Sequence, residues 1–402
     1  MLRVDDRDVA MTVRFAAATV PQRATASTPE NLKPSAFPVA VCEAPLPAGS
    51  RRAKVDGVRL PVPKREVRRI VVIGDTGCRM KASDHAYQPC NDRAKFPFAR
   101  IAARAAKWGP DLVVHVGDYE YRENPCPAAE TGCAGSVWGY GGDAWAADFF
   151  TPAAPLLAAA PIAPARGNHE SYARAGQGWW RFLDGHPAAA AHDCDDLAND
   201  RAGDWSPPYA VPLGGGAQLI LLDLSAAGDK AIPADDWRAV AFEATYQTMV
   251  TLAAAARSSI TVDHYPILGF AASNKGGESK LLPGNLGVQS VFGTDGPRQL
   301  PPASTSCCRG PAEPVHHRLF GDARGRRAAA RTSAAGGRAC AGGGSRELRV
   351  VDRRLRLHDP RTDRPRGVAG DRPRRPWPSG QPLHDHWHAV AVRQGAGLTG
   401  HP

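Results

Sequence analysis

Two short segments of the chain place oxygen and nitrogen donors directly after apolar stretches. The first, Gly-Asp-Tyr-Glu-Tyr, carries the carboxylate of Asp118 and the phenol of Tyr121. The second, Gly-Asn-His-Glu, carries the amide of Asn168 and the imidazole of His169. Such a set of hard oxygen and nitrogen donors suits a pair of metal ions better than any packing role.

Two further segments extend the donor set. Asp75 lies in Gly-Asp-Thr-Gly, and His264 lies in Val-Asp-His-Tyr-Pro. Two cations about 3.5–4 Å apart need a bridging anion, for which Asp118 is the natural candidate. Tyr121 can bind only as a phenolate, which requires a strongly acidic metal such as Fe(III). Asn168 and His264 are neutral donors that suit a divalent ion, so the predicted site is asymmetric.

A strand, a helix and a second strand must position the two carboxylates. The β-branched run at 69–73 predicts a buried strand that ends just before Asp75, and the apolar spacing at 97–108 predicts a helix. Residues 111–116 predict a second strand, which we expect to pair in parallel with the first. Because the carboxyl ends of parallel strands meet in one crevice, we expect Asp75 and Asp118 to lie together there.

The globular part of the chain is predicted to be one α/β domain over residues 66–300. Within it, residues 217–223 predict another buried strand, residues 235–257 a long helix, and residues 258–262 the strand before the last donor segment. Residues 1–65 contain Pro and Thr/Ser/Ala-rich stretches without periodicity. We therefore predict an extended leader followed by an entry segment.

Residues 301–402 differ in composition from the rest of the chain. They contain 19 Arg, no Lys and 8 acidic residues, a net charge of +11, whereas residues 1–300 carry a net charge of −1. Arginine without lysine, clusters of Gly and Pro, and no apolar periodicity predict a disordered tail of low order. A GC-rich gene read in a shifted frame is an alternative explanation, which resequencing codons 295–320 would test.

The ordered donor segments resemble those of the metallophosphoesterase (calcineurin-like) superfamily. Its blocks Asp-x-Gly, Gly-Asp-x-x-Tyr, Gly-Asn-His-Asp/Glu and Val-x-x-His have counterparts here over roughly residues 68–300, although Val262 stands two positions before His264 instead of three. The general pattern has a His two positions after the first Asp, where this chain has Gly77. The purple acid phosphatases lack that His and use the tyrosine, so Gly77 and Tyr121 resemble that branch.

The resemblance implies a metallophosphoesterase-type sandwich of β-sheets flanked by helices, with two metal ions, Fe(III) and a divalent Fe, Zn or Mn ion. It implies the following ligands: Asp75 and Tyr121 on the ferric ion, Asp118 bridging, and Asn168 and His264 on the divalent ion. It places His169 toward substrate, and we assign His169 and Glu170 to catalysis, with Glu170 orienting the imidazole. The reaction implied is hydrolysis of a phosphate monoester of a small molecule by attack of a metal-bound hydroxide.

One expected block is missing from the sequence. No Gly-His-x-His follows His264, so the domain is shortened at its C-terminal end and each ion lacks one histidine. Histidines occur later, at 316–317 and within 384–388, but we expect them to be solvated in the tail. The missing histidines make a catalytically inactive truncated product one alternative. A phosphodiesterase or nucleotide hydrolase is another, because the core motifs alone do not separate it from a monoesterase.

Cysteine spacing bears on the compartment. Cys78 and Cys90 bracket one loop, and Cys126 and Cys133 bracket another, and both pairs suit disulfides if the protein is exported. The alternative is free thiols in a cytosolic enzyme. We expect a secreted or periplasmic protein, although no clear signal peptide is present. No segment approaches a membrane span. Apart from Trp377 and Trp387, the Arg-rich tail lacks the interleaved aromatic residues expected of a nucleic-acid-binding segment, so we do not expect nucleic acid as a partner.

Overall fold

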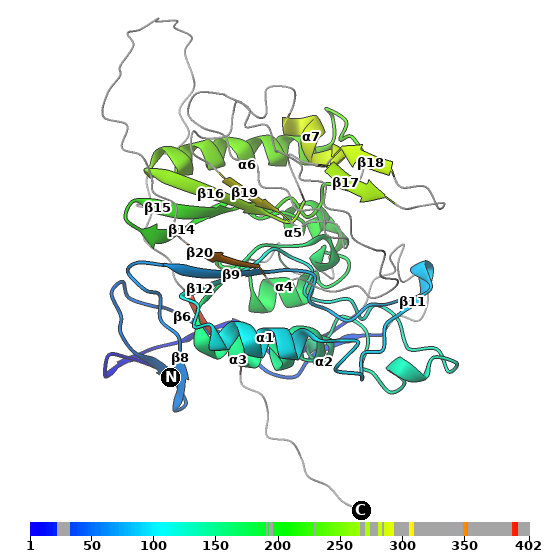
Figure 1. Ribbon diagram of the computed structural model, residues 1–402, viewed down its shortest axis with the longest axis horizontal. Coiled ribbons are helices and arrows are strands. Elements are labelled where there is room, and N and C mark those ends of the chain that lie inside the picture. Colours follow the sequence, from blue (N-terminus) through cyan, green and yellow to red (C-terminus); the bar gives the residue numbers. More distant parts are fainter. Residues whose placement is uncertain are drawn as a thin grey trace, which may run out of the picture.

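Two four-stranded β-sheets lie face to face at the centre of the molecule (Figure 1). The structure is a computed structural model that describes residues 1–21, 33–189, 192, 196–228, 230–265, 270–273, 280–283, 285–292, 305–308, 349–352 and 388–392. Helices cover the outer face of each sheet, giving four layers in the order helix, sheet, sheet, helix. This arrangement confirms the predicted sandwich of sheets flanked by helices.

The first sheet has the strand order β13-β12-β9-β20. Strands β9 (Arg69–Ile73), β12 (Leu112–His115) and β13 (Ile162–Pro164) are parallel, and β20 (Arg349–Asp352) is antiparallel to β9. Helix α1 (Phe98–Lys107) connects β9 to β12 and packs with α3 (Thr151–Ala159). The predicted strand-helix-strand unit is confirmed.

The second sheet has the order β14-β15-β16-β19. Strand β14 (Tyr209–Gly214) is antiparallel to β15 (Ala217–Leu221), and β15, β16 (Ser258–Asp263) and β19 (Thr305–Cys308) are parallel. Helices α6 (Trp237–Ala254) and α7 (Leu286–Phe292) lie on its outer face. The predicted strand, long helix and strand in this half are confirmed.

The two sheets are held together by an apolar layer between them. Its buried members come from both sheets: Val67, Leu112, Val114, Val116, Ala163, Ala165, Val211, Leu213, Leu219, Leu221 and Val262. Full burial of a Val or Leu side chain stabilises the folded state by roughly 1.5–3 kcal/mol. This layer therefore fixes the relative position of the strand ends that carry the donors.

Residues 1–21 and 33–65 form short strands where an extended leader was predicted. They contain β1 (Leu2–Val4), β2 (Arg7–Val9), β3 (Thr12–Phe15), β4 (Ala18–Val20), β5 (Ser35–Phe37), β6 (Val41–Pro45), β7 (Ala53–Val55) and β8 (Val58–Leu60). Strands β2-β1-β7-β8 form one sheet. Strands this short contain too few residues for an alternating pattern to be recognised in sequence, which explains the difference.

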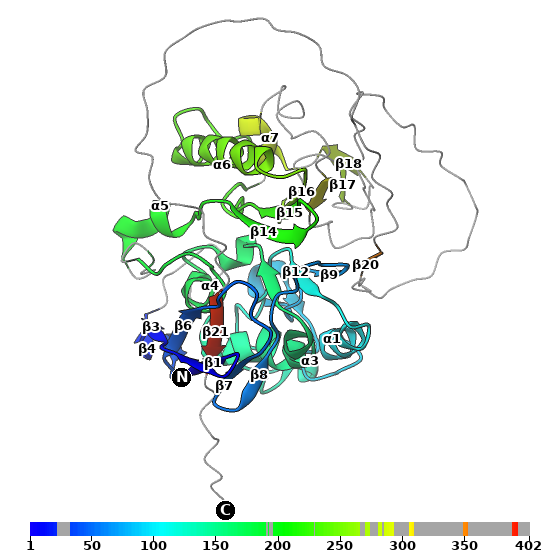
Figure 2. The ribbon, with the colours of Figure 1, turned by 90° about the vertical axis from the view of Figure 1, so that its left-hand side faces the viewer.

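Figure 2 shows these N-terminal strands beside α3 and α4, on the side of the first sheet that faces away from the second sheet. Strand β21 (His388–Val392) pairs with β6. The remaining α-helices and β-strands are short: β10 (Met80–Lys81), β11 (Ala86–Tyr87), α2 (Gly142–Trp145), α4 (Gly176–Phe182), α5 (Asp200–Gly203), β17 (Phe270–Ser273) and β18 (Lys280–Pro283). Most of the tail predicted to be disordered, including His316 and His317, lies outside the described residues.

Both predicted cysteine pairs form disulfides in the structure. Cys78 is bonded to Cys90 and Cys126 to Cys133, with a Cα–Cα distance of 5.7 Å in each pair. Such bonds are typical of an oxidising compartment. In the part of the chain that the structure describes, no helix combines the length and the apolar character needed to cross a membrane.

Candidate metal centre

The two carboxylates predicted to bind metal lie on adjacent turns. Asp75 follows β9 and Asp118 follows β12, and both have left-handed backbones, with φ of +53° and +60°. The turns are joined by hydrogen bonds from the Asp75 N–H to the Gly117 carbonyl and from the Thr76 N–H to the Asp118 carbonyl, both 3.0 Å. A left-handed non-glycine residue costs of order 1–3 kcal/mol, and such strain clusters at functional sites.

Asp118 lies between two sets of donors. Its Oδ2 is 2.6 Å from the Tyr121 Oη, which is also 2.6 Å from Asp75 Oδ1. Its Oδ1 is 3.4 Å from His264 Nε2, which in turn is 3.0 Å from Asn168 Oδ1. The fully buried carboxylate thus directs one oxygen toward the acidic pair and the other toward the neutral pair.

The imidazole of His264 is oriented for ligation. Its Nδ1 is 2.8 Å from the Val116 carbonyl, so Nδ1 carries the proton and donates it to that oxygen. Nε2 then presents its lone pair on the side of Asn168 and Asp118. A backbone acceptor that fixes the tautomer in this way is the usual support of a metal-binding histidine.

Gly77 leaves space for Tyr121. A Cβ at position 77 would lie 2.7 Å from Tyr121 Cδ2, 2.8 Å from Tyr121 N and 2.7 Å from Asp148 Oδ2. Asp148 is buried and accepts a hydrogen bond from the Tyr121 N–H at 2.9 Å, so the surroundings are held in place. A side chain at 77 and the tyrosine ring in this position exclude each other.

His169 is held by two residues that the sequence analysis did not identify. Its Nδ1 is 2.6 Å from Arg174 Nη2 and 3.2 Å from Glu123 Oε1. Arg174 and Glu123 are ion-paired at 2.5 Å, and Tyr140 donates to Glu123 at 3.1 Å. Neither residue belongs to a recognisable motif, because they converge from separate loops.

Glu170, which the sequence analysis assigns to catalysis, supports the backbone of the site. Its carboxylate accepts hydrogen bonds of 2.8–3.2 Å from the N–H groups of residues 118, 119, 120 and 167. Burial and the neighbouring Asp118 raise the pKa of Glu170 to about 8, although the N–H donors favour its charged form. The contacts of His169 described above indicate that Glu123 and Arg174 set the orientation of the imidazole.

A neutral histidine lies behind the two turns. His115 is fully buried, and this burial lowers its pKa well below the usual value. Its Nδ1 accepts from the Gly117 N–H at 3.2 Å, so Nε2 carries the proton and donates to Thr76 Oγ1 at 2.9 Å. His115 thereby links the loop of Asp75 to the loop of Asp118.

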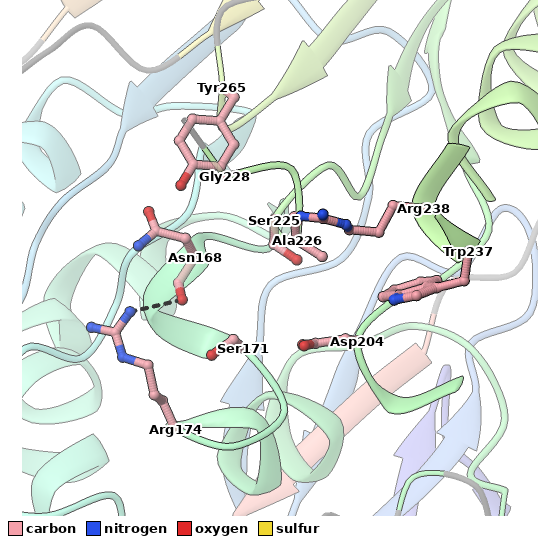
Figure 3. Close-up of a pocket in the computed structure, with 10 residues that line it drawn as sticks. All are labelled: Asn168, Ser171, Arg174, Asp204, Ser225, Ala226, Gly228, Trp237, Arg238 and Tyr265. Carbon is pink, nitrogen blue, oxygen red and sulfur yellow. Dashed lines mark hydrogen bonds between the residues drawn. The ribbon is translucent and has the colours of Figure 1, made fainter. Parts of the chain in front are cut away.

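A pocket of about 450 Å³ lies beside Asn168 (Figure 3). Its lining comes from four loops and the start of α6: Asn168, Ser171, Arg174, Asp204, Ser225, Ala226, Gly228, Trp237, Arg238 and Tyr265. Arg174 donates to the Asn168 carbonyl at 2.9 Å, so this wall is continuous with the candidate ligands. Of the candidate ligands, Asn168 lines the pocket, so the pocket adjoins the donor set at this residue.

The donor chemistry fits two cations. Asp75 and Tyr121 supply acidic oxygens, and Asn168 and His264 supply neutral donors, with the carboxylate of Asp118 between them. Among the residues that the structure describes, no cluster of three His, Cys, Asp or Glu side chains suited to a metal occurs. In β19, Cys308 is in register with Asp263, and the residues that follow it, 309–348, lie outside the described part.

Comparison with known proteins shows the family to which the chain belongs. A family model described as calcineurin-like phosphoesterase matches residues 68–279. PhoD shares 13% identity with a TM-score of 0.34, over 65% of this chain and 54% of that one. Purple acid phosphatase PPD1 from yellow lupin (Lupinus luteus) seeds has 13% sequence identity to this chain and a TM-score of 0.30. The match covers 72% of this chain and 50% of that one. A dimetal phosphatase from Danio rerio has 12% sequence identity to this chain and a TM-score of 0.28. The match covers 51% of this chain and 72% of that one.

The chain thus spans 54% and 50% of the lengths of the first two solved structures. A search of curated proteins gave no match.

Proposed function

The chain belongs to the calcineurin-like phosphoesterase family, and we propose that it is a dinuclear-metal phosphatase acting on phosphate monoesters of small molecules. The observation that carries the proposal is the position of Asp118, whose two carboxylate oxygens face different donor pairs. One bridging carboxylate with an acidic and a neutral donor pair is the arrangement that two unlike cations require.

In this proposal Asp75 and Tyr121 hold a ferric ion, Asn168 and His264 hold a divalent Fe, Zn or Mn ion, and Asp118 is shared. When bound, the cations supply positive charge to the phosphate oxygens and lower the pKa of water. The exclusion between a side chain at 77 and the ring of Tyr121 supports the purple acid phosphatase-like branch.

His169 is proposed as the group that protonates the leaving oxygen. In the neutral imidazole, Arg174 donates to Nδ1, so the proton resides on Nε2, which lies 4.0 Å from Asp118 Oδ2. In the imidazolium, Nδ1–H can donate instead to Glu123 at 3.2 Å. The two partners therefore hold the ring in either protonation state and keep Nε2 directed to the side of Asp118.

The two disulfides support export to an oxidising compartment as part of the proposal. The absence of Gly-His-x-His removes one donor from each cation, so we propose weaker metal binding than in a complete centre.

The test is replacement of His169 by Ala. Because general acid catalysis contributes typically 10²–10⁴-fold, kcat for an alkyl phosphate such as glycerol 2-phosphate should fall within that range. A nitrophenyl phosphate needs little leaving-group protonation, so its kcat should fall less. Metal content should stay at the parent level, and His85→Asn, at an exposed histidine in a left-handed turn, is the matched control.

Loss of metal in His169→Ala would identify His169 as a ligand and contradict its assigned role. Equal losses for both substrates would contradict leaving-group protonation. A parent protein that cleaves bis-nitrophenyl phosphate faster than the monoester would favour the phosphodiesterase alternative, and a parent protein without turnover of either would favour the inactive product.

A further inference from the structure

The pocket beside Asn168 has aromatic side chains on two sides. Trp237 begins α6, and Tyr265 directly follows the candidate ligand His264. Figure 3 shows Tyr265 near Asn168, with Trp237 and Arg238 across the pocket. We infer that this pocket binds the nucleoside portion of a nucleoside monophosphate whose phosphate lies at the candidate metal centre, an inference that rests on the proposed function.

The neighbours of Trp237 in sequence hold the start of α6 in place. Asp236 caps α6 by accepting from the Arg238 N–H at 2.9 Å, and it is ion-paired with the Arg238 guanidinium at 2.6 Å. The same guanidinium donates to the carbonyls of Ala226 and Ala227 at 3.1 and 3.3 Å. These bonds hold the main chain at the start of the helix that carries Trp237, and the indole offers a flat surface on which a base can stack.

Polar groups between the aromatic side chains suit a ribose or the edge of a base. Asp204 is held by the Tyr172 N–H at 2.6 Å and by Arg166 at 3.2 Å, while its side chain stays 25% exposed. Ser225 donates to Asp223 at 2.6 Å, which leaves its oxygen as an acceptor toward the pocket. Hydroxyl and amine groups of a nucleoside match such acceptors.

The size and charge of the pocket favour a nucleoside over other leaving groups. A volume of about 450 Å³ has room for a nucleoside, which is larger than a glycerol-sized alcohol. The two cationic residues of the lining are already ion-paired, Arg174 with Glu123 and Arg238 with Asp236. Among the residues of the lining that the structure describes, there is therefore no unneutralised basic stripe of the kind that a polynucleotide backbone would require.

Equilibrium binding of adenosine to the full chain without added metal tests the inference independently of catalysis. Base–aromatic stacking predicts that Trp237→Ala weakens adenosine binding on the order of 10-fold, while Trp237→Phe stays within about 3-fold of the parent. Val240→Ala, at an exposed position of α6, is the control and should bind as the parent does. Thermal unfolding of each variant verifies folding, and Tyr265→Leu provides a second variant from the opposite wall.

Kinetics of the metal-loaded chain complete the test. Trp237→Ala should lower kcat/KM for adenosine 5′-monophosphate on the order of 10-fold and change that for glycerol 2-phosphate by less than about 2-fold. Failure of the parent to bind adenosine, or equal binding by the parent, Trp237→Ala and Tyr265→Leu, would overturn the inference. Adenosine binding by a chain that hydrolyses no phosphate ester would refute the proposed function and leave the nucleoside site supported.

Discussion

Replacing Gly77 by Ala tests whether the space at this position is reserved for Tyr121. The new Cβ would lie 2.7–2.8 Å from a ring carbon and the main-chain N of Tyr121 and from an oxygen of Asp148. The main-chain N of Tyr121 and the Asp148 oxygen are held in place, because the Tyr121 N–H donates a hydrogen bond to Asp148 and the Asp148 carboxylate is ion-paired with Arg122 at 2.5 Å. The ring must therefore move away from Asp75 and Asp118.

The expected cost follows from the packing. Insertion of one methyl group into a closely packed site destabilises a protein by typically 1–3 kcal/mol, and contacts below 3.0 Å on three atoms place Gly77→Ala in that range. Urea unfolding of the metal-free chain measures this change. Displacement of the Tyr121 Oη should also reduce the visible absorption that a phenolate bound to Fe(III) gives in the iron-loaded chain.

Gly185→Ala is the matched control. A Cβ at position 185 would meet no atom within 4 Å, so this variant should unfold at the parent urea concentration and retain the same absorption. Equal stability and equal colour in Gly77→Ala and Gly185→Ala would refute the argument that Gly77 and the tyrosine are coupled.

Two other substitutions test the supports of the site. Glu170→Gln should turn an NH₂ group toward two of the four N–H donors that the carboxylate now accepts from. At pH 9, where the Glu170 carboxylate is charged, this change should destabilise the fold by about 2–6 kcal/mol in urea unfolding. Unchanged stability with lost turnover would instead indicate a catalytic role for Glu170. Burial raises the pKa of Asp111, but the Lys64 ammonium and the N–H groups of residues 68 and 69 outweigh burial and hold that pKa below its usual value. Its carboxylate therefore stabilises the fold above about pH 4 and loses this effect as the pH falls through the lowered pKa. The stability difference between the parent and Asp111→Asn should shrink between pH 6 and pH 3, and a difference independent of pH would contradict this assignment.

The central elements could be predicted from sequence because each one has a strong local pattern. The run at 69–73 is β-branched and continuous, and Asp75 and Asp118 come within three residues of the strand ends at Ile73 and His115. The crevice rule for parallel strands then brings the two carboxylates together without any knowledge of the intervening 42 residues. The spacing of three between Asp118 and Tyr121 places both oxygens in one cluster.

Other features have no local pattern that sequence reasoning could use. Glu123 and Arg174 reach His169 from loops that are far apart in the chain, so only the tertiary structure shows their convergence. The carboxylate of Glu170 lies among backbone amides, a position that its side-chain type does not reveal. The lining of the pocket likewise has no local sequence pattern, because Asp204 and Trp237 come to line one pocket only when the second sheet and α6 are in place.

Metal analysis of the parent and of Asp118→Asn tests the shared carboxylate most directly. Asparagine tolerates the left-handed backbone at 118 and keeps the side-chain volume, but it removes the negative charge between the two donor pairs. After loading with iron and zinc and removal of excess metal, the parent should retain about two ions per chain and Asp118→Asn at most about one. Equal metal content in the two proteins, or a parent that retains no metal, would contradict the dinuclear centre.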